Sequence, residues 1–275
     1  MATESFAPAK INLTLHVTGR RADGYHLLDS LVVFADIGDT VRVQAAEKLS
    51  LMVDGPMSAG VPVDDSNLVL RAARLLNPAR GAQITLTKRL PASSGIGGGS
   101  SDAAASLRAL CAIWNLPVPE DVLALGADVP VCMQTRAQRL QGVGEVLSAV
   151  ERLPECDILL VNPGVAVSTP EVFRALQSRD NPAMPADLPI WDSAETLADW
   201  LQGQRNDLTA AAVAVQPVIA EVLEALCATQ ALYSGMSGSG ATCFGLFPPG
   251  TGAAAALTTL QARRPSWWAA SGTLL

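Results

Sequence analysis

The segment from residue 91 to residue 102 has the sequence Pro91-Ala-Ser-Ser-Gly-Ile-Gly-Gly-Gly-Ser-Ser-Asp102. Its glycines let the main chain approach an anion without a Cβ in the way, and successive N–H groups can point at one oxyanion. Behind it, a helix with Ser100 as its cap is predicted from apolar residues on one face: Ala103, Ala104, Leu107, Leu110, Cys111 and Trp114. Because a helix N-terminus attracts negative charge, we expect phosphate binding here, although an ordinary tight turn has a similar composition.

Two common phosphate-binding loops do not match this segment. A Walker A loop needs a lysine directly after its last glycine, whereas Gly99 is followed by Ser100 and Ser101. A dinucleotide-binding fingerprint opens a βαβ unit, whereas Gly95-Ile-Gly-Gly-Gly-Ser100 ends in serine and lies deep in the chain. The segment therefore predicts an anion site of another kind, which other motifs must identify.

The composition is that of an acidic globular protein. The 275 residues are 49% hydrophobic and 16% charged, and the formal net charge of -7 does not suit a nucleic-acid partner. The length allows two domains, which we place at residues 1–150 and 151–275. Five scattered cysteines without metal-binding spacing predict reduced thiols. Without a signal-peptide pattern or a membrane-length apolar run, we expect a cytoplasmic protein, as a monomer or weak homodimer.

Apolar periodicity predicts strands and helices in both halves of the chain. Alternation predicts a half-buried strand over 11–17, and further strands are expected over 27–34, 40–43, 83–90, 157–161 and 242–247. Helices are expected over 68–76 behind Asn67, near 193–201 and 217–226, and after Thr169-Pro170-Glu171, where Thr169 would be the cap.

Several motifs together resemble a known kinase family. Residues 91–104 are similar to the phosphate loop of the galactokinase, homoserine kinase, mevalonate kinase and phosphomevalonate kinase (GHMP) superfamily. Pro8-Ala-Lys-Ile-Asn-Leu13 resembles the first motif of that superfamily, and Ser237-Gly-Ser-Gly-Ala241 resembles its third. Arg21-Ala-Asp-Gly-Tyr-His26 and Leu125-Gly-Ala-Asp-Val-Pro130 resemble the branch that acts on a cytidine-diphosphate-linked methylerythritol.

This resemblance implies both a fold and a reaction. The fold would be the two-domain α+β GHMP kinase fold, with a ribosomal protein S5 domain 2-like N-terminal domain and a ferredoxin-like α/β sandwich as C-terminal domain. The reaction would transfer the γ-phosphoryl group of ATP to the 2-hydroxyl of 4-diphosphocytidyl-2-C-methyl-D-erythritol, in the non-mevalonate route to isoprenoid precursors. Mg²⁺ would be bound mainly through the ATP phosphates, and no protein metal ligand, nucleic acid or membrane would take part.

By the same resemblance, two residues are assigned to catalysis. Asp128 would accept the proton of the hydroxyl, and Lys10 would hold that hydroxyl and stabilise negative charge on the transferred group. Taken without the motifs, Lys10 is more typical of a solvent-exposed lysine at a strand end, and Asp128 of a turn or cap residue. The motifs therefore carry both assignments.

The binding residues are likewise implied by the resemblance. ATP would be bound by Asn67, Lys88, Pro91, Gly95, Gly97, Gly98, Gly99, Ser100 and Ser101. The substrate would be bound by Asn12, Tyr25, His26, Thr169, Phe173, Gly238 and Gly240, with Tyr25 and Phe173 enclosing the cytosine and His26 bonding its edge. Three features depart from the pattern. Ile96 replaces the more usual leucine, Asp102 stands where asparagine is common, with its side chain expected to point away from the phosphates, and the connection from Trp114 to Gly126 is short.

Three alternatives stay open at this point. The first is another GHMP kinase, of the homoserine or mevalonate type, against which Tyr25, His26 and Phe173 argue. The second is a nucleotide-binding protein that does no chemistry, against which Lys10 and Asp128 count. The third is a dinucleotide-dependent oxidoreductase, which would bind NAD or FAD.

Overall fold

The computed structural model describes residues 2–250 and 252–275, which divide into two compact units. Unit 1 consists of the residues up to Ala9, Gly38–Ala92 and Gly97–Thr135. Unit 2 consists of Lys10–Ile37, Ser93–Ile96 and Arg136–Leu275. Since the chain passes from one unit to the other several times, neither unit is a continuous half of the sequence. The domain boundary at residue 150 stays a prediction.

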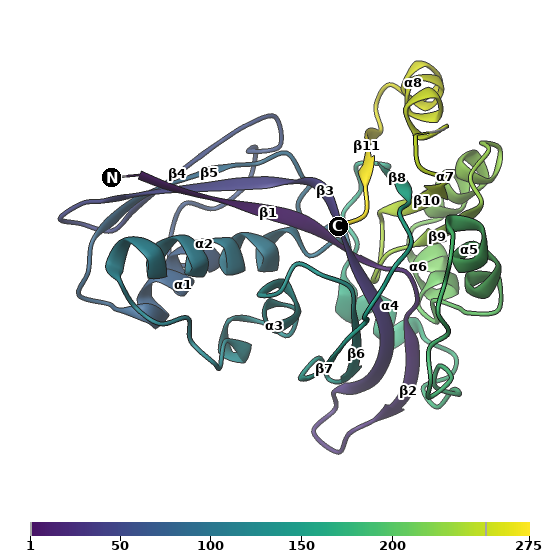
Figure 1. The fold of residues 1–275 in the computed structure, drawn as a ribbon, viewed down its shortest axis with the longest axis horizontal. Helices are drawn as coiled ribbons and strands as arrows, with labels where there is room; N and C mark the ends of the chain where they lie inside the picture. Colours follow the sequence, from purple (N-terminus) through teal and green to yellow (C-terminus); the bar gives the residue numbers. More distant parts are fainter. Residues whose placement is uncertain (1, 251) are drawn as a thin grey trace. The chain divides into compact units, whose positions relative to one another are not determined.

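Unit 1 is a sheet with two main helices packed on it (Figure 1). The second half of the long strand β3 pairs antiparallel with β5, and β5 pairs parallel with β4. Val41 and Val43 of β3 and Ile84 and Leu86 of β5 alternate with polar residues, so their side chains share the face that α1 and α2 cover. The elements here are β3 (His26–Ala45), β4 (Ser50–Asp54), β5 (Ala82–Thr87), α1 (Leu68–Leu76), α2 (Gly98–Trp114), η1 (Leu123–Leu125) and α3 (Val129–Cys132), with the first residues of β1 (Ala2–Asn12).

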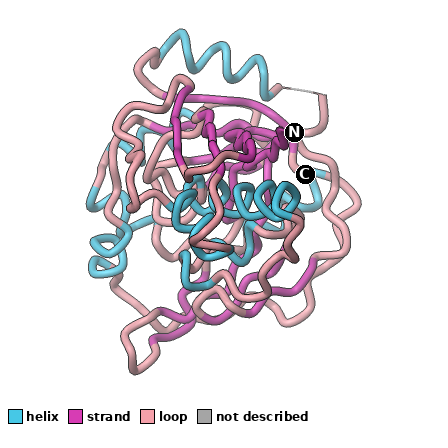
Figure 2. The backbone as a smooth tube through the Cα atoms, turned by 90° about the vertical axis from the view of Figure 1, so that its left-hand side faces the viewer, coloured by secondary structure: helices cyan, strands magenta, loops and turns pink. Residues whose placement is uncertain are grey.

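Unit 2 contains the first half of β3 and a separate antiparallel sheet of four strands in the order β11-β8-β10-β9. Its largest apolar cluster joins this sheet to the surrounding helices, for example through Val161, Ile219, Val222 and Phe247. Helices, strands and long loops alternate along the chain (Figure 2). The elements are β2 (His16–Arg20), β6 (Gln138–Gly142), β7 (Val146–Ala149), β8 (Asp157–Asn162), α4 (Thr169–Ala175), α5 (Ala194–Gln202), α6 (Thr209–Val215), α7 (Val218–Cys227), β9 (Tyr233–Met236), β10 (Cys243–Phe247), α8 (Ala253–Arg263) and β11 (Trp268–Thr273).

Most predicted elements are present, with ends shifted by a few residues. The helix over 68–76 is confirmed as α1, and the side chain of Asn67 caps it by accepting the N–H of Val69 at 2.9 Å. The strands expected over 83–90, 157–161 and 242–247 are β5, β8 and β10, and the helices near 193–201 and 217–226 are α5 and α7. Periodicity therefore located these elements correctly.

Two strand predictions differ from the structure in their bounds. The predicted strands over 27–34 and 40–43 are both present, but they form one continuous strand, β3, because Asp36 to Asp39 keep extended backbone despite their turn-like composition. The half-buried strand expected over 11–17 is divided between β1 and β2, and residues 7–17 are buried on both sides. The alternation of apolar and polar residues over 11–17 therefore does not correspond to one buried and one solvent-exposed face.

Both helix caps predicted next to the motifs are also shifted. Helix α2 begins at Gly98 behind Gly97, which has a left-handed φ of 63°, so Ser100 lies inside the first turn and is not the cap. Helix α4 begins at Thr169, and its N-cap is Ser168. Glycine provided the turn that precedes α2, since it adopts positive φ at little cost.

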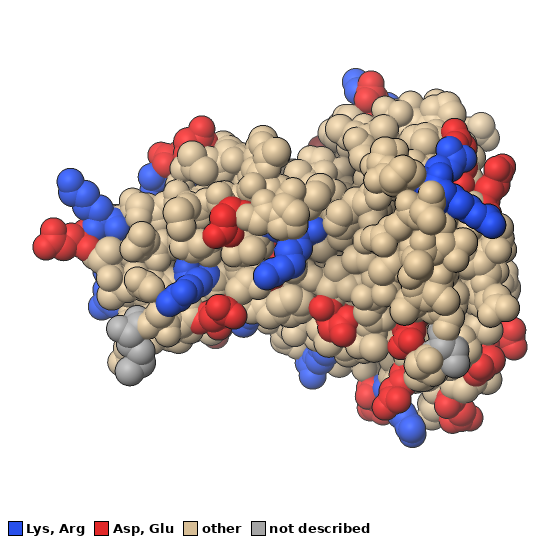
Figure 3. All heavy atoms as spheres, turned by 90° about the horizontal axis from the view of Figure 1, so that it is seen from above, with Lys and Arg blue, Asp and Glu red and all other residues tan. Residues whose placement is uncertain are grey.

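Charged side chains are mixed on the face drawn in Figure 3, where Lys and Arg lie among Asp and Glu. This face therefore offers no broad basic area for a nucleic-acid backbone. Within the described residues, no helix has both the length and the apolar character needed to cross a membrane.

Candidate active site

The glycine segment leads directly into the N-terminus of α2. No side chain caps this helix, and its first turns consist of Gly98, Gly99, Ser100 and Ser101. The first N–H groups of a helix have no partner within it, so this end can accept an anion. The two serines differ, because the Ser101 N–H donates to the Gly97 carbonyl and its hydroxyl donates to the Pro8 carbonyl at 2.7 Å. Of the pair, Ser100 is therefore better suited to contact a phosphate.

Residues 93–96 of the same segment pack within unit 2 against the 237–242 turn. The Ser237 hydroxyl donates to the Gly95 carbonyl at 2.9 Å, and the Thr242 N–H donates to the Ser94 carbonyl at 3.1 Å. A Cβ on Gly95 would lie 2.5 Å from the Ser237 carbonyl oxygen, and φ at Gly95 is 76°. Gly95 is thus needed because its backbone lies directly against the backbone of Ser237. Its place in a phosphate-binding motif did not reveal this requirement.

Lys10 and Asn12 belong to one hydrogen-bond network in unit 2. Lys10 is only 4% exposed, so it is not the solvent-exposed lysine that its sequence context alone suggests. Its Nζ donates to Asn12 Oδ1 at 3.0 Å, and Asn12 Nδ2 donates to Ser30 Oγ at 2.8 Å. The Asn12 N–H donates to Ser237 Oγ at 3.1 Å, which links the network to Gly95. The structure therefore brings Lys10, Asn12 and Ser237 together, and the functional roles assigned to this region stay predictions.

Asp128 lies at the start of the short helix α3 in unit 1. It is the N-cap residue and is half-buried, and its carbonyl accepts the N–H of Cys132 at 3.3 Å. Arg108 of α2 donates to the Cys132 carbonyl at 3.0 Å and to the Phe6 carbonyl at 2.9 Å. These bonds fasten α3, which begins directly after Asp128, to α2 and β1.

A buried ion cluster in unit 1 was not expected from the sequence. Lys88 lies between Asp39 and Asp102, forming an ion pair with each, and all three residues are at most 3% exposed. The contact to Asp102 Oδ2 is 2.8 Å, whereas Asp102 Oδ1 has no hydrogen-bond partner. The Asp102 side chain is thus held inside the protein by Lys88. For Lys88 and Asn67 the predicted ATP contacts stay predictions, and the polar side-chain atoms of both already have protein partners.

Burial raises the pKa of Asp102 to about 7, an effect that Lys88 opposes and that the Asp39 carboxylate reinforces. Burial by itself lowers the pKa of Lys88, but the two carboxylates outweigh it and raise that pKa. The local sequence Gly38-Asp39-Thr40 did not indicate that Asp39 would belong to a buried ion cluster.

We expect the stability difference between the wild type and Asp102→Asn to depend on pH. A carboxyl with a raised folded-state pKa stabilises the fold below its unfolded value near 3.8, and this contribution is lost as the pH rises through about 7. From about pH 5 to about pH 8 the wild type should therefore lose on the order of 2 kcal/mol relative to the variant. Urea unfolding of both proteins at the two pH values measures this, and a difference independent of pH would contradict the raised pKa.

The residues predicted to bind cytosine lie in unit 2, but their arrangement differs from a simple sandwich. The Phe173 ring stacks on His26, with centroids 4.5 Å apart and planes at 23°. Tyr25 is 64% exposed, and His26 Nε2 is buried without a hydrogen-bond partner. Burial and the charges of Arg20 and Arg179 lower the pKa of His26, which favours the neutral ring. A neutral histidine with an unpaired nitrogen is suited to bond a base edge.

Thr169 and the glycines of the 237–240 turn are also close together. The Thr169 hydroxyl lies 2.7 Å from the Ser239 hydroxyl, so the start of α4 is fastened to this turn. Gly238 and Gly240 have φ values of 57° and 85°, which permits the turn. Asn206 Nδ2 donates to the carbonyls of Met236 and Gly238, a support that the sequence did not indicate.

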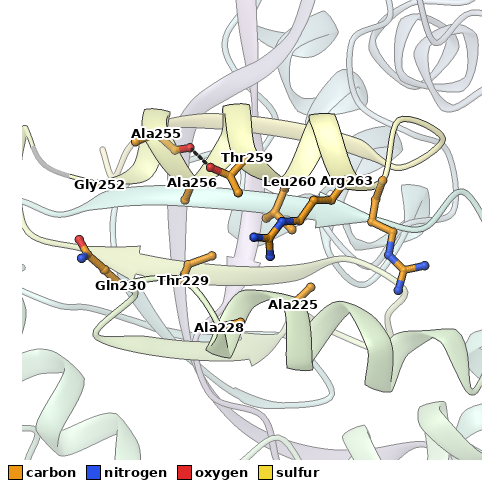
Figure 4. A pocket seen from close by; sticks show the side chains of 11 residues that line it. Ala225, Ala228, Thr229, Gln230, Gly252, Ala255, Ala256, Thr259, Leu260 and Arg263 are labelled. Carbon is orange, nitrogen blue, oxygen red and sulfur yellow. Dashed lines mark hydrogen bonds between the residues drawn. The ribbon is translucent and has the colours of Figure 1, made fainter.

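A hollow of about 380 Å³ between α7 and α8 of unit 2 lies apart from these residues (Figure 4). Alanines form much of its wall, and within it the Thr259 hydroxyl donates to the Ala255 carbonyl at 2.9 Å. None of the predicted site residues lines it.

Comparison with known proteins agrees with the motifs. The model named GHMP kinases N terminal domain matches residues 67–143, and the model named GHMP kinases C terminal matches residues 191–265. A Ruegeria pomeroyi protein named 4-diphosphocytidyl-2-C-methyl-D-erythritol kinase is 59% identical over 279 residues, covering 100% of both chains. A Paracoccus denitrificans protein of the same name is 54% identical and covers 98% of this chain and 95% of its own.

Solved structures give the same result. The crystal structure of a 4-(cytidine 5'-diphospho)-2C-methyl-D-erythritol kinase has a TM-score of 0.79 at 35% identity, covering 99% of both chains. A homoserine kinase from Cytophaga hutchinsonii has a TM-score of 0.62 at 17% identity, covers 100% of this chain and 94% of its own, and shares the fold. The predicted two-domain α+β GHMP kinase fold is confirmed, and the chain belongs to the GHMP kinase family, among relatives named 4-diphosphocytidyl-2-C-methyl-D-erythritol kinase.

Proposed function

We propose that this protein is an ATP-dependent kinase that phosphorylates the 2-hydroxyl of 4-diphosphocytidyl-2-C-methyl-D-erythritol. The observation that carries the proposal is the 59% identity over the full length to a relative with that name. The motif residues support it, because Lys10, Asn12, His26 and Asp128 are all present in the chain. The alternatives of a homoserine or mevalonate type of kinase share the fold at much lower identity.

The proposed reaction breaks the bond between the γ-phosphorus of ATP and its bridging oxygen and forms a bond to the substrate oxygen. Asp128 takes the hydroxyl proton, and ADP leaves with the bridging electrons. A carboxylate is a weak base toward an alcohol, so the proton moves late, once the oxygen has begun to bond phosphorus. Lys10 supplies positive charge beside the reacting oxygen, where negative charge develops.

ATP suits the N-terminus of α2 in this proposal. The uncapped first turn offers the N–H groups of Gly98 and Gly99, and no Cβ at these positions hinders a phosphate. Mg²⁺ would enter with ATP, bound mainly to its phosphates, and would neutralise part of their charge. The cytoplasmic location and the monomeric or weakly dimeric state stay predictions.

The direct test measures ADP release with ATP and Mg²⁺ against a panel of alcohols. The panel contains 4-diphosphocytidyl-2-C-methyl-D-erythritol, homoserine, mevalonate and galactose. We expect turnover of the cytidine-linked substrate alone. Turnover of homoserine or mevalonate alone would assign the other type of GHMP kinase, and nucleotide binding without any turnover would favour the non-catalytic alternative.

Removal of the Phe173 ring should weaken substrate binding specifically. Stacking of a base on an aromatic ring contributes on the order of 1–3 kcal/mol, so Phe173→Ala should raise the KM for the cytidine-linked substrate about tenfold or more. The KM for ATP should not change. Phe173→Leu is the matched variant, because it keeps apolar contact with His26 but has no aromatic face. A wild-type KM in Phe173→Leu would show that Phe173 only packs.

A further inference from the structure

The ion cluster of Asp39, Lys88 and Asp102 connects the two ends of the glycine segment. Lys88 directly follows β5 and leads into Pro91, whereas Asp102 lies in the N-terminal part of α2. Asp39 Oδ1 accepts the N–H groups of Arg89 and Leu90, the latter at 2.9 Å. The cluster therefore binds the backbone that enters the segment and the helix that leaves it.

Lys88 also lies against the first residue of that helix. A Cβ placed on Gly98 would be 3.6 Å from Lys88 Nζ, so the ammonium group is adjacent to the turn at Gly97. Its ammonium group donates hydrogen bonds to the carboxylates of Asp39 and Asp102, and the residue is only 3% exposed. Lys88 therefore acts as an internal brace, by which we mean a buried residue that holds two backbone segments together through its ion pairs. It does not extend toward a nucleotide as a cationic binding side chain would.

The free-energy cost of burying such a cluster suggests that its role is to position the backbone and not to stabilise the fold. Three ionisable groups in a dry interior lose their hydration, and apolar side chains of similar size often stabilise a fold as well or better. Asp102 Oδ1 has no hydrogen-bond partner, which adds to this cost. Ion pairs and hydrogen bonds are directional, however, and they specify one backbone geometry more narrowly than apolar contacts do. The segment that benefits from one defined geometry is the one between Leu90 and Gly98.

We propose that Asp39, Lys88 and Asp102 are positioning residues for nucleotide binding: they fix both ends of the glycine segment, and Lys88 acts on ATP through that segment without contacting it. This inference rests on the proposed function only in that the segment binds ATP. It does not depend on which alcohol is phosphorylated.

The Asp39→Asn variant distinguishes a positioning role of Lys88 from direct contact between Lys88 and ATP. The asparagine keeps the shape of the side chain and one acceptor oxygen but removes the charge that holds Lys88. If Lys88 contacts ATP directly, release from Asp39 leaves ATP affinity unchanged or raises it. If the cluster positions the segment, we expect the Kd for ATP to rise about tenfold, by isothermal titration with ATP and Mg²⁺. Asp65→Asn, which removes an exposed ion pair with Arg74 in the same unit, should leave this Kd unchanged.

A double-mutant cycle completes the test. Lys88→Met and Asp39→Asn should each weaken ATP binding, and the double variant should be no weaker than Lys88→Met alone, because both substitutions disrupt one brace. Additive effects, or wild-type affinity in Asp39→Asn, would overturn the proposal. Asp102→Asn, which keeps an acceptor for Lys88, is the milder variant if Lys88→Met does not fold, and it should lie between the wild type and Asp39→Asn. Since binding is measured without an alcohol, a wrong substrate assignment would appear only as failed turnover.

Discussion

Asp128→Asn should lower kcat by about 10²- to 10⁴-fold, the usual scale for loss of a general acid or base. The amide has nearly the shape of the carboxylate but does not accept the hydroxyl proton at neutral pH. The local fold should persist, because the backbone carbonyl of residue 128 still accepts the Cys132 N–H and Arg108 still holds the end of α3. The measurement is ADP release with both substrates saturating.

The KM values distinguish the proposed role from a binding role. If Asp128 acts on the proton, the KM for ATP and for the cytidine-linked substrate should change little while kcat falls. Asp121→Asn is the matched control, since Asp121 is exposed and its side chain accepts the Leu123 N–H at the start of η1, away from α3. Turnover near the wild-type rate in folded Asp128→Asn would remove Asp128 from the catalytic residues.

Lys10→Ala should lower kcat on a similar scale, about 10²- to 10⁴-fold, because positive charge at the developing oxyanion is lost. The substitution also removes the donor of Asn12 Oδ1 and leaves space in a buried region. Lys10→Met avoids most of that space and removes only the charge and its hydrogen bonds. If both variants lose the same activity, the loss belongs to the ammonium group.

Lys48→Met is the control for Lys10, because Lys48 is exposed and its charge is solvated. Its kcat should equal that of the wild type. Urea unfolding of the Lys10 variants shows whether they remain folded at the assay temperature. A folded Lys10→Met enzyme with wild-type kcat would contradict the assignment.

Local patterns in the sequence predicted the elements that depend on local physics. Asn67 was recognised as a cap because an asparagine side chain can satisfy the free N–H of Val69 without distant partners. Strand β5 was recognised because Ile84 and Leu86 alternate with polar residues above an apolar layer. The GHMP fold followed from ordered motifs, and the comparisons confirm it.

What sequence reasoning missed depends on distant contacts. Asp39 meets Lys88 across 49 residues only because β3 and β5 pair in one register, with Thr40 opposite Thr87. Gly95 is required by the carbonyl of Ser237, 142 residues away along the chain. Neither relation leaves a pattern of residues that a single sequence shows, since each residue looks like an ordinary turn residue in its own neighbourhood.

The interleaving of the two units has a consequence for any attempt to divide the protein. A fragment ending at residue 150 would contain Lys10–Ile37 and Ser93–Ile96 but lack most of the unit to which they belong. In that fragment Asn12 would lose Ser237, and the Leu15 N–H would lose the Arg205 carbonyl. Such a fragment would therefore leave these segments without their partners. Split reporters, tags or circular permutations are better placed in exposed loops inside one unit than at the midpoint of the chain.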